Sequence, residues 1–136
     1  MKKALLTALI SLTFSTVSHA KDYERDALTI DKSVNQDIEF QFPNDDNRYP
    51  ELSDFEVVNY VTMSNEYGDR KVVVTLRNNS SGNRIFVSDQ IMALYANGQR
   101  ISPYETKVSF KGRETQTLTL SFDSSKFPIL TIYTRD

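Results

Sequence analysis

The chain contains no cysteine and no tryptophan among its 136 residues, and it has only one histidine, four glycines and four prolines. Without cysteine, neither a disulfide framework nor a thiolate nucleophile is available, and we expect no lipid anchor. Zinc, copper and haem sites depend on histidine or cysteine, so no such cofactor is expected. The four glycines are isolated from one another, which excludes a glycine-rich phosphate-binding loop.

The single histidine lies in a segment that we expect to be removed. Two lysines precede an apolar run over Ala4–Phe14, and residues 18–20 (Ser-His-Ala) supply small residues around a cleavage site. This pattern is typical of a bacterial secretory signal peptide, and the apolar run is shorter than the roughly 20 residues that a membrane span needs. We therefore expect residues 1–20 to be a signal peptide. Residues 21–136 are then one soluble domain, without a membrane anchor, in the periplasm or outside the cell.

Cleavage would leave 116 residues with fourteen basic and eighteen acidic side chains, because two of the sixteen basic residues leave with the signal. A net charge of −4 argues against nucleic acid and anionic lipid as partners. A mature chain without histidine also lacks the usual general base of nucleophilic catalysis. We expect a protein that is not an enzyme and binds no cofactor or transition metal.

The clearest structural pattern is a two-residue alternation of apolar and polar side chains, which is typical of half-buried strands. In Lys71–Asn79, Val72, Val74 and Leu76 share one face, and asparagines and serines follow. Comparable strands are expected at 27–30, Asp37–Phe42, Phe55–Met63, Arg84–Val87, Ile91–Ala96, Arg100–Ser102, Thr106–Phe110, Thr115–Phe122 and Ile129–Thr134. The only helical turn expected lies within Ser88–Ala93.

The glycines mark the reversals between these strands. They lie 14, 16 and 14 residues apart, each in a polar turn, and Asn97-Gly98 is the dipeptide preferred in type I′ hairpins. Many short amphipathic strands in one small domain must pair two apolar sheet faces. The sequence therefore predicts an all-β, antiparallel, immunoglobulin-like β-sandwich of about eight strands, and a small barrel is the alternative.

The alternation also predicts which side chains form the core. Asn59 interrupts the apolar face of its strand, which indicates a bulge or a sheet edge. The expected core residues are Ile38, Phe40, Phe55, Val57, Val61, Val72, Val74, Leu76, Ile85, Val87, Leu94, Val108, Phe110, Leu118, Leu120, Phe122, Leu130 and Ile132.

Three features together carry a resemblance to a known group of proteins. The run Val72–Ser81, the Asn-Gly hairpin and Thr115–Phe122 are similar to those of short bacterial extracytoplasmic immunoglobulin-like proteins. In particular, residues 55–134 resemble an enterobacterial family of secreted proteins whose function is not assigned. The resemblance implies a β-sandwich in the cell envelope and carries over no functional residues.

Two kinds of side chain are candidates for binding. Asp45 and Asp46 offer hard oxygen ligands in one polar loop, but the loop lacks the spacing and the glycine of an EF-hand, so we expect no metal site there. Tyr49, Tyr67 and Tyr104 lie in predicted loops, where an amphipathic ring adds contact area at low entropic cost. An alternative interpretation is that these rings cover strand ends.

These observations favour a non-catalytic interaction module whose partner is another envelope protein or a second copy of the chain. The contact surface would be the loops at 44–50, 64–69 and 97–104, or an unpaired sheet edge that recruits an extended segment. The alternative is a glycan-binding module, in which Tyr49, Tyr67 and Tyr104 form a stacking platform beside Asp45 and Asp46.

Overall fold

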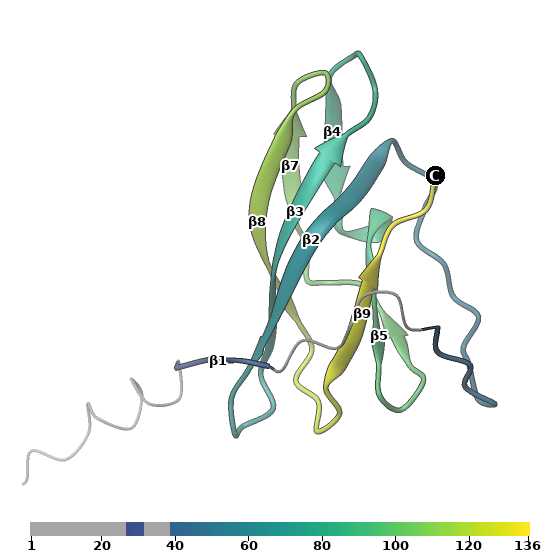
Figure 1. Ribbon diagram of the computed structural model, residues 1–136, viewed down its shortest axis with the longest axis vertical. Coiled ribbons are helices and arrows are strands. Elements are labelled where there is room, and N and C mark those ends of the chain that lie inside the picture. The colour runs from purple at the N-terminus through teal and green to yellow at the C-terminus, as the bar shows by residue number, and fades with distance from the viewer. Residues whose placement is uncertain (1–26, 32–38) are drawn as a thin grey trace, which may run out of the picture.

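The computed structural model describes residues 27–31 and 39–136, so the expected signal peptide and the predicted core residue Ile38 lie outside the described residues. The described part is built of strands and one short 3-10 turn (Figure 1). The elements are β1 (Thr29–Ile30), β2 (Phe55–Ser64), β3 (Arg70–Asn78), β4 (Arg84–Val87), η1 (Ser88–Gln90), β5 (Met92–Tyr95), β6 (Arg100–Ile101), β7 (Lys107–Phe110), β8 (Thr115–Phe122) and β9 (Ile129–Tyr133).

All pairs of these strands are antiparallel, and they form three sheets with the orders β1-β2-β3-β8, β4-β7 and β6-β5-β9. Figure 1 shows β8 at the outer margin of the four-stranded sheet, on the side away from β9. A single parallel bridge joins Leu52 to Arg135 and ties the residues before β2 to the end of the chain. The predicted all-β antiparallel class is confirmed.

Most predicted strands are found, and β4 and β8 have the predicted bounds. The strand predicted over Asp37–Phe42 is the exception, because residues 39–42 belong to no strand. Phe40 and Phe42 are half-buried and stack on each other, with ring centroids 6.4 Å apart. The alternation here therefore places two rings on one side of an extended segment that joins no sheet.

A β-bulge in β2 changes which of its side chains face inward. The register shifts between the pairs Val57–Leu76 and Asn59–Thr75, as the interruption at Asn59 had indicated. A bulge adds one residue to one strand and so reverses the inside and outside positions that follow it. Tyr60 packs against the core, whereas Val61 is 42% exposed, so the prediction that Val61 is buried is wrong.

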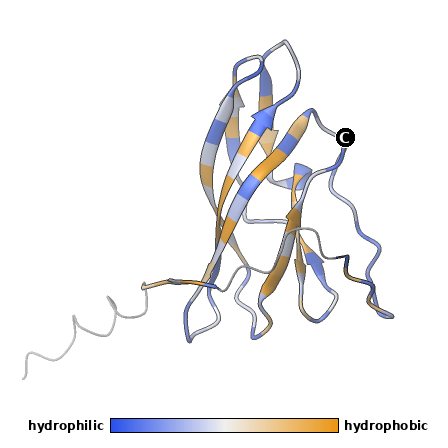
Figure 2. Cartoon of the chain, viewed as in Figure 1, coloured by the Kyte–Doolittle hydropathy of each residue, from blue (hydrophilic) through white to orange (hydrophobic). Residues whose placement is uncertain are grey.

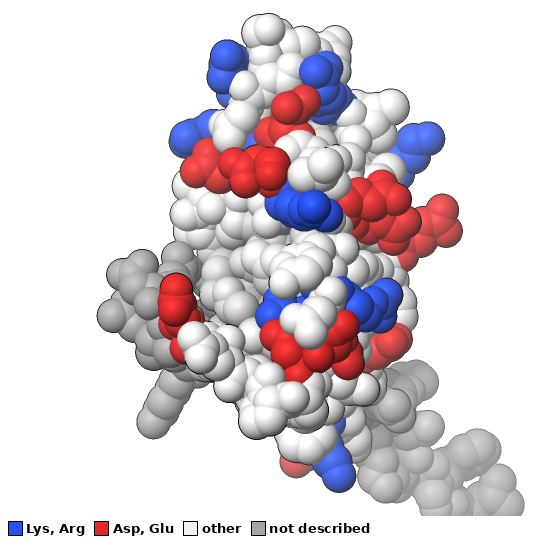
Figure 3. Space-filling view, turned by 90° about the vertical axis from the view of Figure 1, so that its right-hand side faces the viewer, with Lys and Arg blue, Asp and Glu red and all other residues white. Residues whose placement is uncertain are grey.

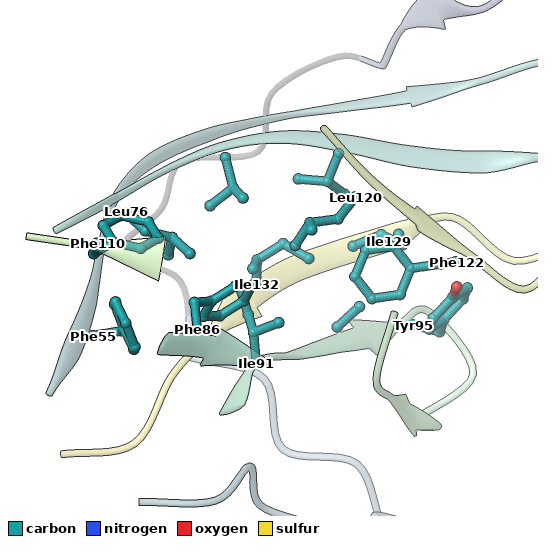
Figure 4. Packing of buried hydrophobic residues seen from close by; sticks show 13 residues of the cluster. Phe55, Leu76, Phe86, Ile91, Tyr95, Phe110, Leu120, Phe122, Ile129 and Ile132 are labelled. Carbon is teal, nitrogen blue, oxygen red and sulfur yellow. The ribbon is translucent and has the colours of Figure 1, made fainter. Parts of the chain in front are cut away.

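The core lies between the four-stranded sheet and the strands of the other two sheets (Figure 4). Three phenylalanine rings from β2, β4 and β7 meet edge to face, with centroids 4.9 to 6.5 Å apart, an arrangement that aromatic quadrupoles favour. Figure 2 shows apolar and polar residues alternating along the long strands. The buried cluster is Phe55, Val72, Val74, Leu76, Phe86, Ile91, Ala93, Tyr95, Phe110, Leu120, Phe122, Ile129 and Ile132.

The face of β4 was predicted incorrectly. Ile85 is 52% exposed, whereas its neighbour Phe86 is fully buried, so Phe86 and not Ile85 belongs to the core. Both faces of β4 carry apolar residues, so periodicity alone does not select the inner one. Periodicity also under-predicted the core in the next segment. All of residues 91–95 are buried, whereas only Leu94 among them was predicted to be in the core. Of these, Tyr95 donates its hydroxyl to the carbonyl of Asp123, and burial raises the pKa of this tyrosine.

Gly98 and Gly112 are required at their turns for different physical reasons. Gly98 has a φ of 86°, and its N–H donates to the Tyr95 carbonyl, but Asn97 does not have a positive φ. The hairpin is therefore a type I turn followed by a glycine bulge, and the predicted type I′ turn is wrong. At Gly112, a Cβ atom would lie 2.0 Å from the carbonyl oxygen of Ser81, so a close approach of two backbones requires glycine.

The observed face of β4 predicts effects of very different size for two neighbouring substitutions. Phe86→Ala should lower the free energy of unfolding by about 3–5 kcal/mol, because it empties a fully buried site. Ile85→Ala should change it by less than about 0.5 kcal/mol, as at exposed positions generally. Equilibrium denaturation with urea measures both values, and a larger effect at Ile85 would contradict this packing.

Candidate functional site

Arg100 in β6 is the centre of the first group of predicted site residues. Its Nε and Nη2 atoms lie 2.7 and 2.6 Å from Oδ1 and Oδ2 of Asp45, a two-pronged ion pair. The guanidinium and the N–H of Asn47 lower the pKa of the Asp45 carboxyl to about 2. The guanidinium also lies 5.8 and 5.2 Å from the ring centroids of Tyr49 and Tyr133.

Side chains of the same loop also form hydrogen bonds with the backbone of Arg100 in β6. The Asp46 carboxylate accepts the N–H of Arg100 at 3.2 Å, and the guanidinium of Arg48 makes a long bond of 3.5 Å to the Arg100 carbonyl. The Asn44 amide donates to the carbonyl of Asn97 in the adjoining hairpin at 3.0 Å. Since an unpaired strand edge invites pairing with another chain, these contacts close the edge of β6.

The two carboxylates that offer hard oxygen ligands in this loop, Asp45 and Asp46, are thus both engaged by Arg100. The part of the chain that the structure describes holds no group of three or more acidic or histidine side chains that could bind a metal ion. Tyr49 is 59% exposed and lies near the guanidinium of Arg135 as well as that of Arg100. Figure 3, which looks onto this side of the molecule, shows acidic and basic side chains beside one another.

Tyr104 lines a separate polar hollow of about 230 Å³ near the turn between β2 and β3. Asp69 in its wall accepts hydrogen bonds from Asn65 and Ser124, and Arg70 donates twice to the carbonyl of Ser125. The carboxylate of Asp123 raises the pKa of the Tyr104 phenol. Asp69 and Arg70 in the wall of the hollow therefore already have hydrogen-bond partners.

The predicted binding residues consequently occupy two places. Asp45, Asp46 and Tyr49 lie on the segment before β2, whereas Tyr67 lies in the β2–β3 turn and Tyr104 lines the hollow beside it. Figure 1 shows that turn and the segment before β2 on opposite sides of the same end of the molecule. Tyr67 and Tyr104 are 50% and 56% exposed. That these five residues bind a partner stays a prediction.

A larger hollow of about 680 Å³ lies on the outer face of the β4–β7 pair. The exposed Ile85 contributes to its lining, together with Lys111 and Glu114. Arg84 at its margin pairs with Asp54 at 2.7 Å. The alternation in β4 gives no sign of this hollow, because it predicts that Ile85 is buried.

The outer edge of β8 differs from the closed edge of β6. The Ser121 carbonyl accepts the N–H of Tyr104, which lies outside the sheet, so Ser121 directs its backbone groups away from β3. Antiparallel strands alternate in this respect from one residue to the next. Thr115, Thr117 and Thr119 must therefore also point their N–H and C=O groups outward.

A second contact, at the other end of β8, shows the same alternation of backbone groups between β3 and the outer edge. The carbonyl of Glu114 accepts the N–H of Asn78 in β3, so even-numbered residues face β3. Within the described residues, no hydrogen bond is made by the N–H or C=O groups of Thr115, Thr117 and Thr119. All three threonine residues are exposed. β8 therefore presents an open ladder edge of three residues.

Comparison of the chain with protein-family models, with curated proteins and with solved structures finds no match in any of the three. The strand pairing within this chain shows an all-β antiparallel architecture. In the described residues there is no helix with the length and apolar character needed to cross a membrane.

The Asp45–Arg100 pair should make stability depend on pH in the acid range. A carboxyl whose pKa is lowered from about 3.8 to about 2 stabilises the fold above pH 4, and this contribution is lost as the pH falls through 2. Asp45→Asn should therefore destabilise the protein at pH 7, and the difference from wild type should shrink toward pH 2. Urea denaturation at several pH values measures it.

The matched control is Asp45→Asn in a protein that lacks the Arg100 guanidinium. In an Arg100→Gln background, Asp45→Asn should have a much smaller effect at every pH, because only the N–H of Asn47 still binds the Asp45 carboxylate. An undiminished, pH-dependent effect in that background would show that another group holds the Asp45 carboxylate.

Proposed function

We propose that the chain is an immunoglobulin-like β-sandwich that acts as a non-catalytic protein-interaction module in the periplasm or outside the cell. The burial of β2, β3 and β8 against β5, β7 and β9 supports the two-layered arrangement. The lysines, apolar run and small residues within positions 1–20 support export. The binding mode is strand addition at the edge of β8.

The observation that carries this proposal is the open edge formed by Thr115, Thr117 and Thr119. Strand addition draws its affinity from main-chain hydrogen bonds and needs a row of unpaired N–H and C=O groups. β8 offers such a row over an eight-residue strand without a charge or a proline, the devices that usually block an edge. The edge of β6, by contrast, is occupied by Asp46 and Arg48.

Glycan binding is the second candidate, and the exposure of Tyr67 and Tyr104 near the polar hollow supports it. Aromatic rings that are half exposed beside hydrogen-bonding groups suit the faces and hydroxyls of a sugar. Asp45, Asp46 and Tyr49 would take no part in such a site, because they lie on the other side and contact Arg100.

Affinity capture from an envelope extract, with four variants as bait, separates the two functions. Thr117→Pro removes one outward N–H and is sterically tolerated at an edge position, so it should weaken capture of a protein partner at least about tenfold. Thr117→Val keeps the N–H and the branched side chain and should capture like wild type. Tyr67→Ala and Tyr104→Ala should also leave capture of a protein partner unchanged.

The reverse pattern would overturn strand addition. If Tyr67→Ala and Tyr104→Ala abolish capture while Thr117→Pro does not, the ligand binds at the polar hollow, as a glycan would. Unfolding curves of every bait show whether each variant is folded.

A further inference from the structure

The open edge of β8 has a symmetry that selects one kind of partner. Its outward residues are three threonines at alternate positions, so the pattern reads the same in both directions about Thr117. The open stretch is bounded at one end by Arg113, whose N–H donates to the Ser80 carbonyl, and at the other by Ser121. Thr117 is also midway between these two boundaries.

We infer that this edge pairs with the same edge of a second copy of the chain, antiparallel and with Thr117 facing Thr117 across a twofold axis. This inference rests on the proposed strand addition and names its partner. The register places Thr115 opposite Thr119 of the other copy. The two four-stranded sheets then continue into one sheet through β8 and its symmetry mate.

The backbone groups fit this register without any change in β8. Outward-facing residues that stand opposite each other in an antiparallel pair exchange two N–H···O=C bonds. The three pairs made by Thr115, Thr117 and Thr119 would therefore form about six hydrogen bonds. A twofold interface requires such self-complementarity, because the same patch serves both subunits.

The side chains of β8 also suit a copy of themselves. Thr115–Phe122 contains no charged residue, so no like charges oppose each other when two strands of this sequence meet. The threonine hydroxyls are held on the outer face, where Thr117 Oγ1 lies 2.9 Å from Thr75 Oγ1 and Arg77 donates to Thr115 Oγ1. Threonine–threonine pairs across strands are favourable.

The contact between the two copies closes on itself. The edge of β6 is closed by the loop before β2, and one twofold contact uses the open edge of β8 in both copies. An isologous contact of this kind closes at two subunits, whereas a head-to-tail contact would continue into a fibre. The chain would accordingly be a reversible dimer at sufficient concentration.

Single-cysteine variants test the register, because the chain has no cysteine of its own. Facing Cα atoms in a hydrogen-bonded pair lie about 5.5 Å apart, which is within disulfide range, so Thr117→Cys should oxidise to a covalent dimer. Thr115→Cys is the matched control. Its two copies would be offset by four residues, or about 13 Å along the strands, and should cross-link about tenfold more slowly.

Sedimentation velocity over a range of concentrations tests the association itself. Wild type should pass from monomer to dimer, and Thr117→Lys should weaken the dimer at least about tenfold, because two like charges then face each other at the axis. Thr119→Lys, which faces Thr115 of the other copy, is the matched control and should weaken it less. Unchanged unfolding midpoints in both variants exclude a folding defect.

The outcomes separate this inference from the proposed function. Wild type that stays monomeric, or equal cross-linking at positions 115 and 117, overturns the twofold pair. If the wild-type protein stays monomeric but captures a protein that the Thr117→Pro variant does not capture, strand addition stands and the partner is a different protein. If Thr117→Lys leaves dimerisation intact, the copies meet through another surface and the inference is wrong.

Discussion

The pairing of backbone groups at strand edges is the constraint on which the other features of this molecule depend. Each edge has N–H and C=O groups that must find a partner or remain in water. At β6, Asp46 and Arg48 supply that partner from a segment more than fifty residues earlier in the chain. At β7, the Gln116 amide binds the carbonyl of Ser109. The middle of β8 has no such closure, and this difference between edges is the basis of both the proposed function and its twofold partner.

The strands could be predicted where one face is apolar and the other polar. In β3 and β8 that condition holds, and β8 has the predicted bounds. It fails at Ile85, where both faces of the strand are apolar, and at residues 91–95, which are buried on every side. At Val61 the alternation itself is regular, but the bulge between Val57 and Asn59 reverses which positions face inward. Such a bulge is fixed by pairing with β3, and the single polar residue Asn59 is its only local signal.

The candidate site was less predictable, because contacts between distant segments determine it. Residue type identified Asp45, Asp46 and Tyr49 as candidates for binding, but their common partner Arg100 lies about 55 residues away in the sequence. No local sequence pattern indicates a contact between segments so far apart in the chain. The openness of β8 likewise depends on which strand ends a sheet. The sequence of β8 contains one hint. Its eight residues include no charge and no proline, whereas edge strands usually carry such residues to block pairing with another chain.

The central claim is that alternate backbone groups of β8 are open, and amide hydrogen exchange measures this most directly. At concentrations where the protein sediments as a monomer, the N–H groups of Thr115, Thr117 and Thr119 should exchange at least about a hundredfold faster than those of Leu118 and Leu120, which bond to β3. Alternating protection along the strand is the predicted result. Uniform slow exchange over residues 115–120 in the monomer would contradict the account, because it would mean that the edge is already closed.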